Sequence, residues 1–162
     1  MSTRLVTAGS GILGRAIKYW LPVFVMVGLM YYASTDVLSG ENTRGAIEKF
    51  LSSLGLQVTW HTLARINYWL RKTAHFTEYA LLCWLLFRAF RADSPYRWRF
   101  RWAVFSLVIC ACWALLDELH QTFTRTRGGS INDSILDSVG ALVSLAAIGV
   151  SAAVRRNKTR YS

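Results

Sequence analysis

The 162-residue chain is long enough for one domain, and its composition excludes an ordinary soluble protein. Hydrophobic residues make up 53% of it, including 7 Trp, 7 Tyr and 8 Phe, and they gather into four long stretches. A net charge of +10 would suit a nucleic-acid partner, but its distribution along the chain is that of a membrane protein, so we expect no nucleic acid.

Four segments each approach the roughly 20 apolar residues that a helix needs to cross a bilayer. They cover about residues 17–33, 73–90, 102–120 and 135–154. They predict an all-α fold, an integral membrane four-helix bundle forming a single domain over residues 1–162. Cleavage of the first segment as a signal peptide is not expected, because the site after "YYA" would put the bulky Tyr31 where a small residue is needed.

Positive charge alternates between the connections. The segments before the first span, between the second and third, and after the fourth hold 12 cations and one acid, Asp93. The other two connections, with the adjoining helix ends, hold 7 cations and 8 acids. This pattern predicts that both termini are cytoplasmic and that the two near-neutral connections lie outside. The basic surplus also favours attraction to anionic lipid.

The connection between the first two spans is not a featureless loop. Residues 43–56 and 59–70 carry apolar side chains at helical spacing, and the first of these segments ends near Gly55. They predict two short amphipathic helices on the outer membrane surface, acting as anchors or as a lid over a site below. The cysteines Cys83, Cys110 and Cys112 all lie inside predicted spans, where a packing role is expected.

Polar residues interrupt three of the spans at the end predicted to face outward. The second span begins with a polar face formed by Arg71, Lys72, His75, Glu78 and Tyr79. The third span ends with Asp117, Glu118, His120 and Gln121. The fourth span begins with a stripe of Asp133, Asp137, Gly140 and Ser144, in which the two small residues suit close helix packing. Charges at membrane depth cost at least about 2.5 kcal/mol each unless they pair or face a wet cavity. The three clusters therefore predict one common extracytoplasmic polar pocket.

The blocks "RKTAHFTEYALL" and "DELHQTFTRTRGGSINDSILDSVGA" resemble those of the VanZ-like family of bacterial membrane proteins, named for a member linked to teicoplanin resistance. The resemblance covers roughly residues 19–155. It matches Lys72, His75, Glu78 and Tyr79 to a first motif and Asp117, Glu118, His120 and Gln121 to a second. It matches Arg127, Asp133, Asp137 and Gly140 to a third, where Arg125 and Thr126 replace the Pro-Gly pair of many relatives. The resemblance implies a role in the cell envelope and a multi-pass location in the bacterial cytoplasmic (inner) membrane.

The polar residues leave two interpretations open. They could be hydrogen-bonded and ion-paired groups that fix helix packing, or a site that binds or modifies a lipid-linked, phosphate-bearing surface molecule, affecting teicoplanin susceptibility. In the second interpretation, His75 or Glu78 is the base and Glu118 with Asp117 the acid or charge partner. Arg127 with Lys72 forms the anion clamp, while Tyr79, Gln121, Asp133 and Asp137 complete the binding residues. His120 is the remaining catalytic candidate.

Other classes of function remain as alternatives. The same pocket could serve a non-enzymatic binder or shield, and a small transporter or channel subunit is disfavoured because the polar groups cluster at one leaflet. No cofactor is predicted; the nitrogen and oxygen ligands would allow a divalent metal, but the spacing matches neither the His-Glu-x-x-His zinc motif nor the di-iron repeat. The expected partner is a membrane lipid or lipid-linked envelope precursor, and a homo-oligomer remains open.

Overall fold

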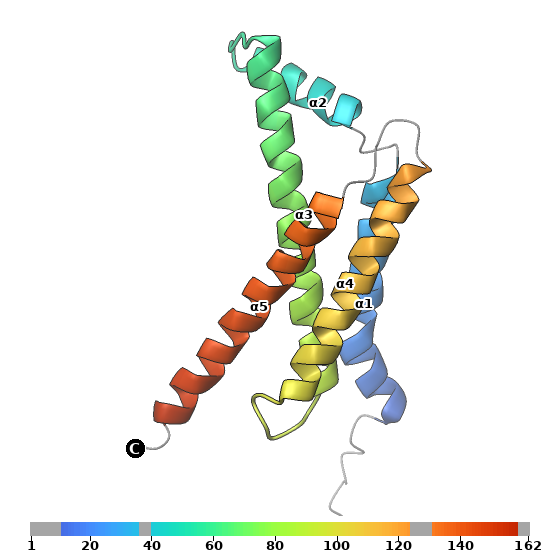
Figure 1. Cartoon of the computed structure of the whole chain (residues 1–162), viewed down its shortest axis with the longest axis vertical. Coiled ribbons are helices and arrows are strands. Elements are labelled where there is room, and N and C mark those ends of the chain that lie inside the picture. The colour runs from blue at the N-terminus through green and yellow to red at the C-terminus, as the bar shows by residue number, and fades with distance from the viewer. Residues whose placement is uncertain (1–10, 36–39, 124–130, 159–162) are drawn as a thin grey trace, which may run out of the picture.

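The computed structural model describes residues 11–35, 40–123 and 131–158, which form five helices and no strand. The helices are α1 (Ile12–Ser34), α2 (Gly40–Ser53), α3 (Trp60–Arg91), α4 (Phe100–Thr122) and α5 (Ile131–Lys158). Four are long, and α2 is a short helix beside the upper end of α3 (Figure 1). The predicted all-helical class is confirmed.

The centre of the molecule is α3, which contacts each of the other four helices. One face of α3 is buried in a core shared with α1, α4 and α5. The core residues include Tyr79, Leu82, Cys83 and Leu86 of α3, Cys110 and Ala114 of α4, Ala141 and Leu145 of α5, and Val23 and Met30 of α1. Cys83 and Cys110 are buried and all three cysteines are free, which agrees with the packing role expected for that pair. The core is therefore built around the second half of α3, from Tyr79 onward.

Three helices are long and apolar enough to cross a membrane: Ile12–Ser34, Phe100–Thr122 and Ile131–Arg156. They contain the predicted spans 17–33, 102–120 and 135–154. Their outward faces expose large apolar side chains such as Phe24, Phe105 and Leu142, which a soluble monomer would rarely display over so wide an area. The fourth predicted span, 73–90, is helical within α3 but is not among these three, because polar residues occupy its first turns.

The connection between α1 and α3 differs from the sequence prediction in one respect. A short helix, α2, does form, and the turn after it has Gly55 at a φ of 76°, with the Leu56 N–H donating to the Leu51 carbonyl. The second predicted surface helix, residues 59–70, is not separate, because it is the first part of α3. Thr59 caps that helix, and neither glycine nor proline interrupts the chain from Trp60 to Arg91, so the helical hydrogen bonds run on into the bundle.

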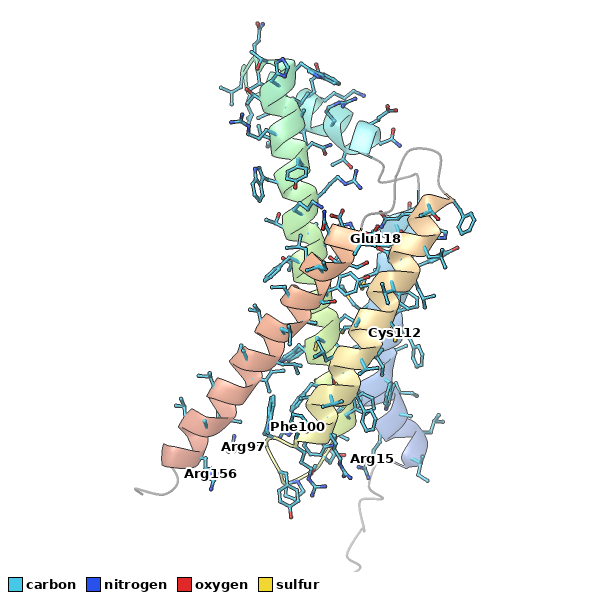
Figure 2. The ribbon with its side chains drawn as sticks, in the orientation of Figure 1. Arg15, Arg97, Phe100, Cys112, Glu118 and Arg156 are labelled. Atoms are coloured by element: carbon cyan, nitrogen blue, oxygen red, sulfur yellow. The ribbon has the colours of Figure 1, made fainter. Side chains whose placement is uncertain are left out.

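The lower end of the bundle gathers basic residues around the connection between α3 and α4. Arg15, Arg97 and Arg156 all lie at this end, whereas Glu118 lies at the opposite end (Figure 2). The acid of this connection, Asp93, accepts a hydrogen bond from Tyr19 and forms ion pairs with Arg15 (3.1 Å) and Lys18 (3.4 Å) of α1. The segments predicted to be cytoplasmic thus meet at one end of the structure.

Candidate functional site

The polar face of α3 lies against the polar stripe of α5. Lys72 forms an ion pair with Asp133, and the Nδ1 atom of His75 lies 3.6 Å from Oδ1 of Asp137. The residue numbers of both partners increase together, so α3 and α5 run in the same direction here. Two of the three clusters that the sequence predicted to converge are therefore in contact.

Gly140 allows this contact. A Cβ atom at position 140 would lie 2.5 Å from the backbone carbonyl oxygen of Phe76, so only glycine fits between the two helices. The close approach lies next to the pairing of His75 with Asp137, since Phe76 follows His75 on α3 and Gly140 is three residues beyond Asp137 on α5. The packing role expected for Gly140 is confirmed by this geometry.

A cavity of about 220 Å³ lies beside the α3–α5 contact. Its polar lining includes His75 and Glu78 of α3 and Asp117 of α4. The other lining residues are Met30, Ala33 and Ser34 of α1, Thr43 of α2, and Leu70, Arg71 and Ala74 of α3. Four helices therefore contribute to one small space in which a histidine and two carboxylic acids are brought together.

A second cavity, of about 280 Å³, adjoins the first. Its lining contains the cationic side chains of Arg44, Arg71 and Lys72, together with Ala64, Asn67, Tyr68, His75 and Asp133. Arg71 and His75 line both cavities. We call the two together the paired cavity: one part holds the carboxylic acids Glu78 and Asp117, and the other is rich in cations.

The cations of the paired cavity are held in different ways. The guanidinium of Arg44 stacks on the Trp60 ring at 4.0 Å, and Lys72 is ion-paired with Asp133. Arg71 lies against Gly40, whose carbonyl accepts a hydrogen bond from Asn67 (3.0 Å). Among the residues that the structure describes, Arg71 makes no ion pair. Its charge is thus available to an anion.

Behind the cavities, the buried side chains of Asp137 and Tyr79 are fully enclosed. Neither carboxylate oxygen of Asp137 nor the Tyr79 hydroxyl has a hydrogen-bond partner among the described residues, and the 3.6 Å separation from His75 is longer than a hydrogen bond. Buried polar atoms of native proteins nearly always have a hydrogen-bond partner from the protein or from ordered water, so these atoms call for an explanation. Nδ1 of His75 also lacks a hydrogen-bond partner among the described residues, so an imidazole, a carboxyl group and a hydroxyl lie buried in the same part of the predicted site.

The second predicted cluster is only partly brought to the cavity. Asp117 lines it and accepts a hydrogen bond from the buried Gln121 (2.9 Å). Glu118 is buried on α4 near the start of α5 (Figure 2). His120 lies elsewhere, with its ring 5.1 Å from that of Tyr31 on α1. Arg127 falls outside the described residues.

Sequence reasoning missed part of the lining. Arg71 was recognised on the polar face of its helix but received no role, and Arg44, Thr43 and Ser34 were not singled out. Nothing in the local pattern marks the last three, because only the packing of α1 and α2 against α3 brings them to the site. Within the described residues, no group of three or more His, Cys, Asp or Glu side chains is arranged to hold a metal ion.

The fold and site together define a helical protein of the membrane class, in which a partly open and largely apolar cavity near one end of the long helices has His75, Glu78 and Asp117 in its lining. A family model described as VanZ/LLP1 matches residues 19–151, most of the chain, and the chain belongs to this family. The resemblance noted in the motifs is thereby confirmed. A comparison with curated proteins and one with solved structures each gave no match.

Proposed function

We propose that this protein is a cell-envelope membrane protein whose paired cavity binds or modifies a lipid-linked, phosphate-bearing surface molecule. The observation that carries the proposal is that Arg71 and His75 line both a cation-rich cavity and a cavity containing Glu78 and Asp117. A single ligand could therefore place an anionic group among cations while an adjoining group reaches the histidine and the acids.

The cation-rich part suits a phosphate. Guanidinium groups bind phosphate through two parallel N–H donors, and among the described residues neither Arg71 nor Arg44 of this site forms an ion pair with an acid. Arg44, held over Trp60, presents a second guanidinium to the same space. In this proposal Lys72 and Arg127 complete the anion clamp.

The acid-containing part suits proton transfer or tight binding of a polar headgroup. His75 and Glu78 lie one turn apart on α3 and line the same cavity, so either can serve as the base, and Asp117 supplies the acid or charge partner. The lining also includes Met30, Leu70 and other apolar side chains, which suits a ligand with a lipid tail. Glu118 and His120 take supporting positions in this proposal, since neither lines the cavity.

The orientation follows from the charges. The basic end of the bundle, with Arg15, Arg97 and Arg156, is proposed to face the cytoplasm, and the paired cavity the outside of a bacterial cytoplasmic membrane crossed several times (Figure 2). An envelope molecule would then reach the site without crossing the bilayer. In this proposal any effect on teicoplanin susceptibility arises through the ligand that the paired cavity binds or modifies.

The test uses the purified full chain incubated with lipid-linked envelope precursors, with binding and covalent change both followed by mass spectrometry. The variants are Arg71→Gln, His75→Gln and Glu78→Gln. Each has a matched exposed control outside the cavities: Arg65→Gln, His61→Gln and Glu48→Gln. We expect the site variants to lose at least tenfold in retained precursor or product, while the controls behave as the unsubstituted protein.

The outcomes separate the classes of function. A precursor whose mass changes only with the unsubstituted protein identifies an enzyme. Retention without a mass change identifies a binder or shield. Equal retention by the site variants and their controls, at equal expression and folding, would refute the assignment of the paired cavity.

A further inference from the structure

A larger cavity lies at the opposite end of the bundle from the paired cavity. It measures about 550 Å³, is partly open, and is lined by residues from the N-terminal half of α1, the last turns of α3, the C-terminal part of α5 and the connection after α3. Figure 1 shows α5 diverging from α4 toward this end. The proposed function makes no use of this cavity.

The charge of this cavity is strongly positive. Its lining includes five cationic side chains: Lys18, Arg88, Arg91, Arg97 and Arg155. Its described acidic residue is Asp93, whose carboxylate is already engaged by Tyr19, Arg15 and Lys18. A surplus of positive charge therefore remains for an anion of another molecule.

Contacts within the protein hold two of these guanidinium groups without neutralising them. Arg88 donates to the Lys18 carbonyl (3.3 Å) and lies 5.3 Å from the Tyr19 ring, and Arg91 donates through Nε to the Tyr96 carbonyl (3.3 Å). Each retains further N–H donors. Among the described residues Arg97 makes no ion pair, and it also lines an adjoining cavity of about 520 Å³ between the connection and α5.

The other wall of the cavity is apolar. Trp84 and Phe87 of α3 and Ile148 and Ala152 of α5 line it, and Trp84 is 46% exposed on the outer surface of the bundle. A free inorganic anion gains nothing from such a wall. A molecule with a phosphate beside hydrocarbon chains can contact both the cations and the wall at once.

We propose that this basic cavity binds the phosphate of an anionic phospholipid, whose acyl chains lie along Trp84 and Ile148. The predicted orientation places it at the cytoplasmic leaflet, where anionic lipids are attracted by clustered lysine and arginine. Basic pockets between membrane helices are a recognised setting for phospholipid headgroups. Binding there would also join α5 to α1 and α3 at the end where the helices diverge.

The test measures lipid retained by the delipidated full chain in detergent, using native mass spectrometry. Three probes distinguish the sources of phosphate: phosphatidylglycerol, phosphatidylcholine and soluble glycerol phosphate. We expect phosphatidylglycerol to bind at least tenfold more tightly than the other two. Arg97→Gln is expected to weaken it roughly fivefold, the effect of about one interfacial cation.

Two further variants make the result specific. Arg101→Gln removes an exposed charge from the same end of the bundle but outside the cavity lining, and is expected to leave binding unchanged. Trp84→Ala is expected to weaken phosphatidylglycerol without affecting glycerol phosphate. Equal losses of phosphatidylglycerol binding from Arg97→Gln and Arg101→Gln would indicate attraction to diffuse surface charge. Equal binding of glycerol phosphate and phosphatidylglycerol would indicate an anion site that does not recognise lipid. Either result overturns the proposal. Neither of these results depends on the paired cavity, so the lipid-binding proposal and the proposed function can fail separately.

Discussion

Gly140 of α5 lies so close to Phe76 of α3 that a methyl group at position 140 would stand 2.5 Å from the Phe76 carbonyl oxygen. This contact allows the helices that carry His75 and Asp137 to pack closely. The position of the proposed site thus depends on the absence of a side chain as much as on the polar groups around it.

Gly140→Ala should therefore destabilise the protein. A clash with backbone cannot be relieved by a change of rotamer, and overpacking of this kind costs about 1–3 kcal/mol. We expect the melting temperature in detergent to fall by several degrees. Gly28→Ala is the control, because a Cβ there meets nothing within 4 Å and alanine favours a helix. A Gly140→Ala protein that melts with the unsubstituted one would show that the helices are less tightly packed than described.

The Lys72–Asp133 pair should show measurable coupling. The side chains are 20% and 30% exposed, so water screens them less than a surface pair. In a double-mutant cycle of Lys72→Ala and Asp133→Ala, followed by thermal unfolding, we expect a coupling free energy of about 1–2 kcal/mol. The more exposed pair of Arg15 with Asp93 should give a smaller value in the same assay. Additive effects at positions 72 and 133 would mean that the pair contributes nothing to stability.

Asp137 should behave as a functional rather than a stabilising residue. Its enclosed carboxyl group lies 3.6 Å from Nδ1 of His75 and has no hydrogen-bond partner among the described residues, and burying a carboxyl group without hydrogen bonds is unfavourable. We expect Asp137→Asn to keep or raise the melting temperature while reducing retention of the envelope precursor. Asp133→Asn, which breaks the ion pair with Lys72, should lower the melting temperature instead. A fall of several degrees for Asp137→Asn would assign that residue a structural role.

The contacts of Asp93 should make stability depend on acid pH. The hydrogen bond from Tyr19, followed by the charges of Lys18 and Arg15, lowers the pKa of Asp93 from its ordinary value of 3.8. The pKa of Asp93 is lower in the folded state than in the unfolded state. Its ionised carboxylate therefore contributes its full stabilisation above the unfolded-state pKa, and this stabilisation is lost as the pH falls through the lowered folded-state pKa. We expect the difference in melting temperature between the unsubstituted protein and Asp93→Asn to be largest at neutral pH and to shrink below about pH 4.

Tyr19→Phe provides the control for that measurement. It removes the main cause of the lowered pKa and leaves both cations, so its melting temperature should depend on acid pH less steeply than that of the unsubstituted protein. A constant difference between the unsubstituted protein and Asp93→Asn from neutral pH to pH 3 would contradict the linkage.

Much of the architecture was predictable from local pattern. Long apolar runs located three of the four predicted spans in helices that are long and apolar enough to cross a membrane, and the i, i+4, i+7 spacing of Asp133, Asp137 and Gly140 was enough to place them on one helix face. The i, i+3 spacing of Lys72 and His75 likewise placed them on one face of α3. Helical periodicity is a local property, so it can be read without knowing what the helix packs against.

Tertiary structure decided which of those faces meet and what else joins them. Lys72 is paired with Asp133, and His75 with Asp137, because the close approach at Gly140 sets the register of α3 against α5. His120, one turn from Asp117 in sequence terms, lies against Tyr31 instead of the cavity, and Arg44 reaches the site from a separate helix. Such contacts join residues far apart along the chain, and they are set by the register of each helix and its rotation about its own axis. Register and rotation depend on packing against neighbouring helices, and no single segment of sequence contains that information.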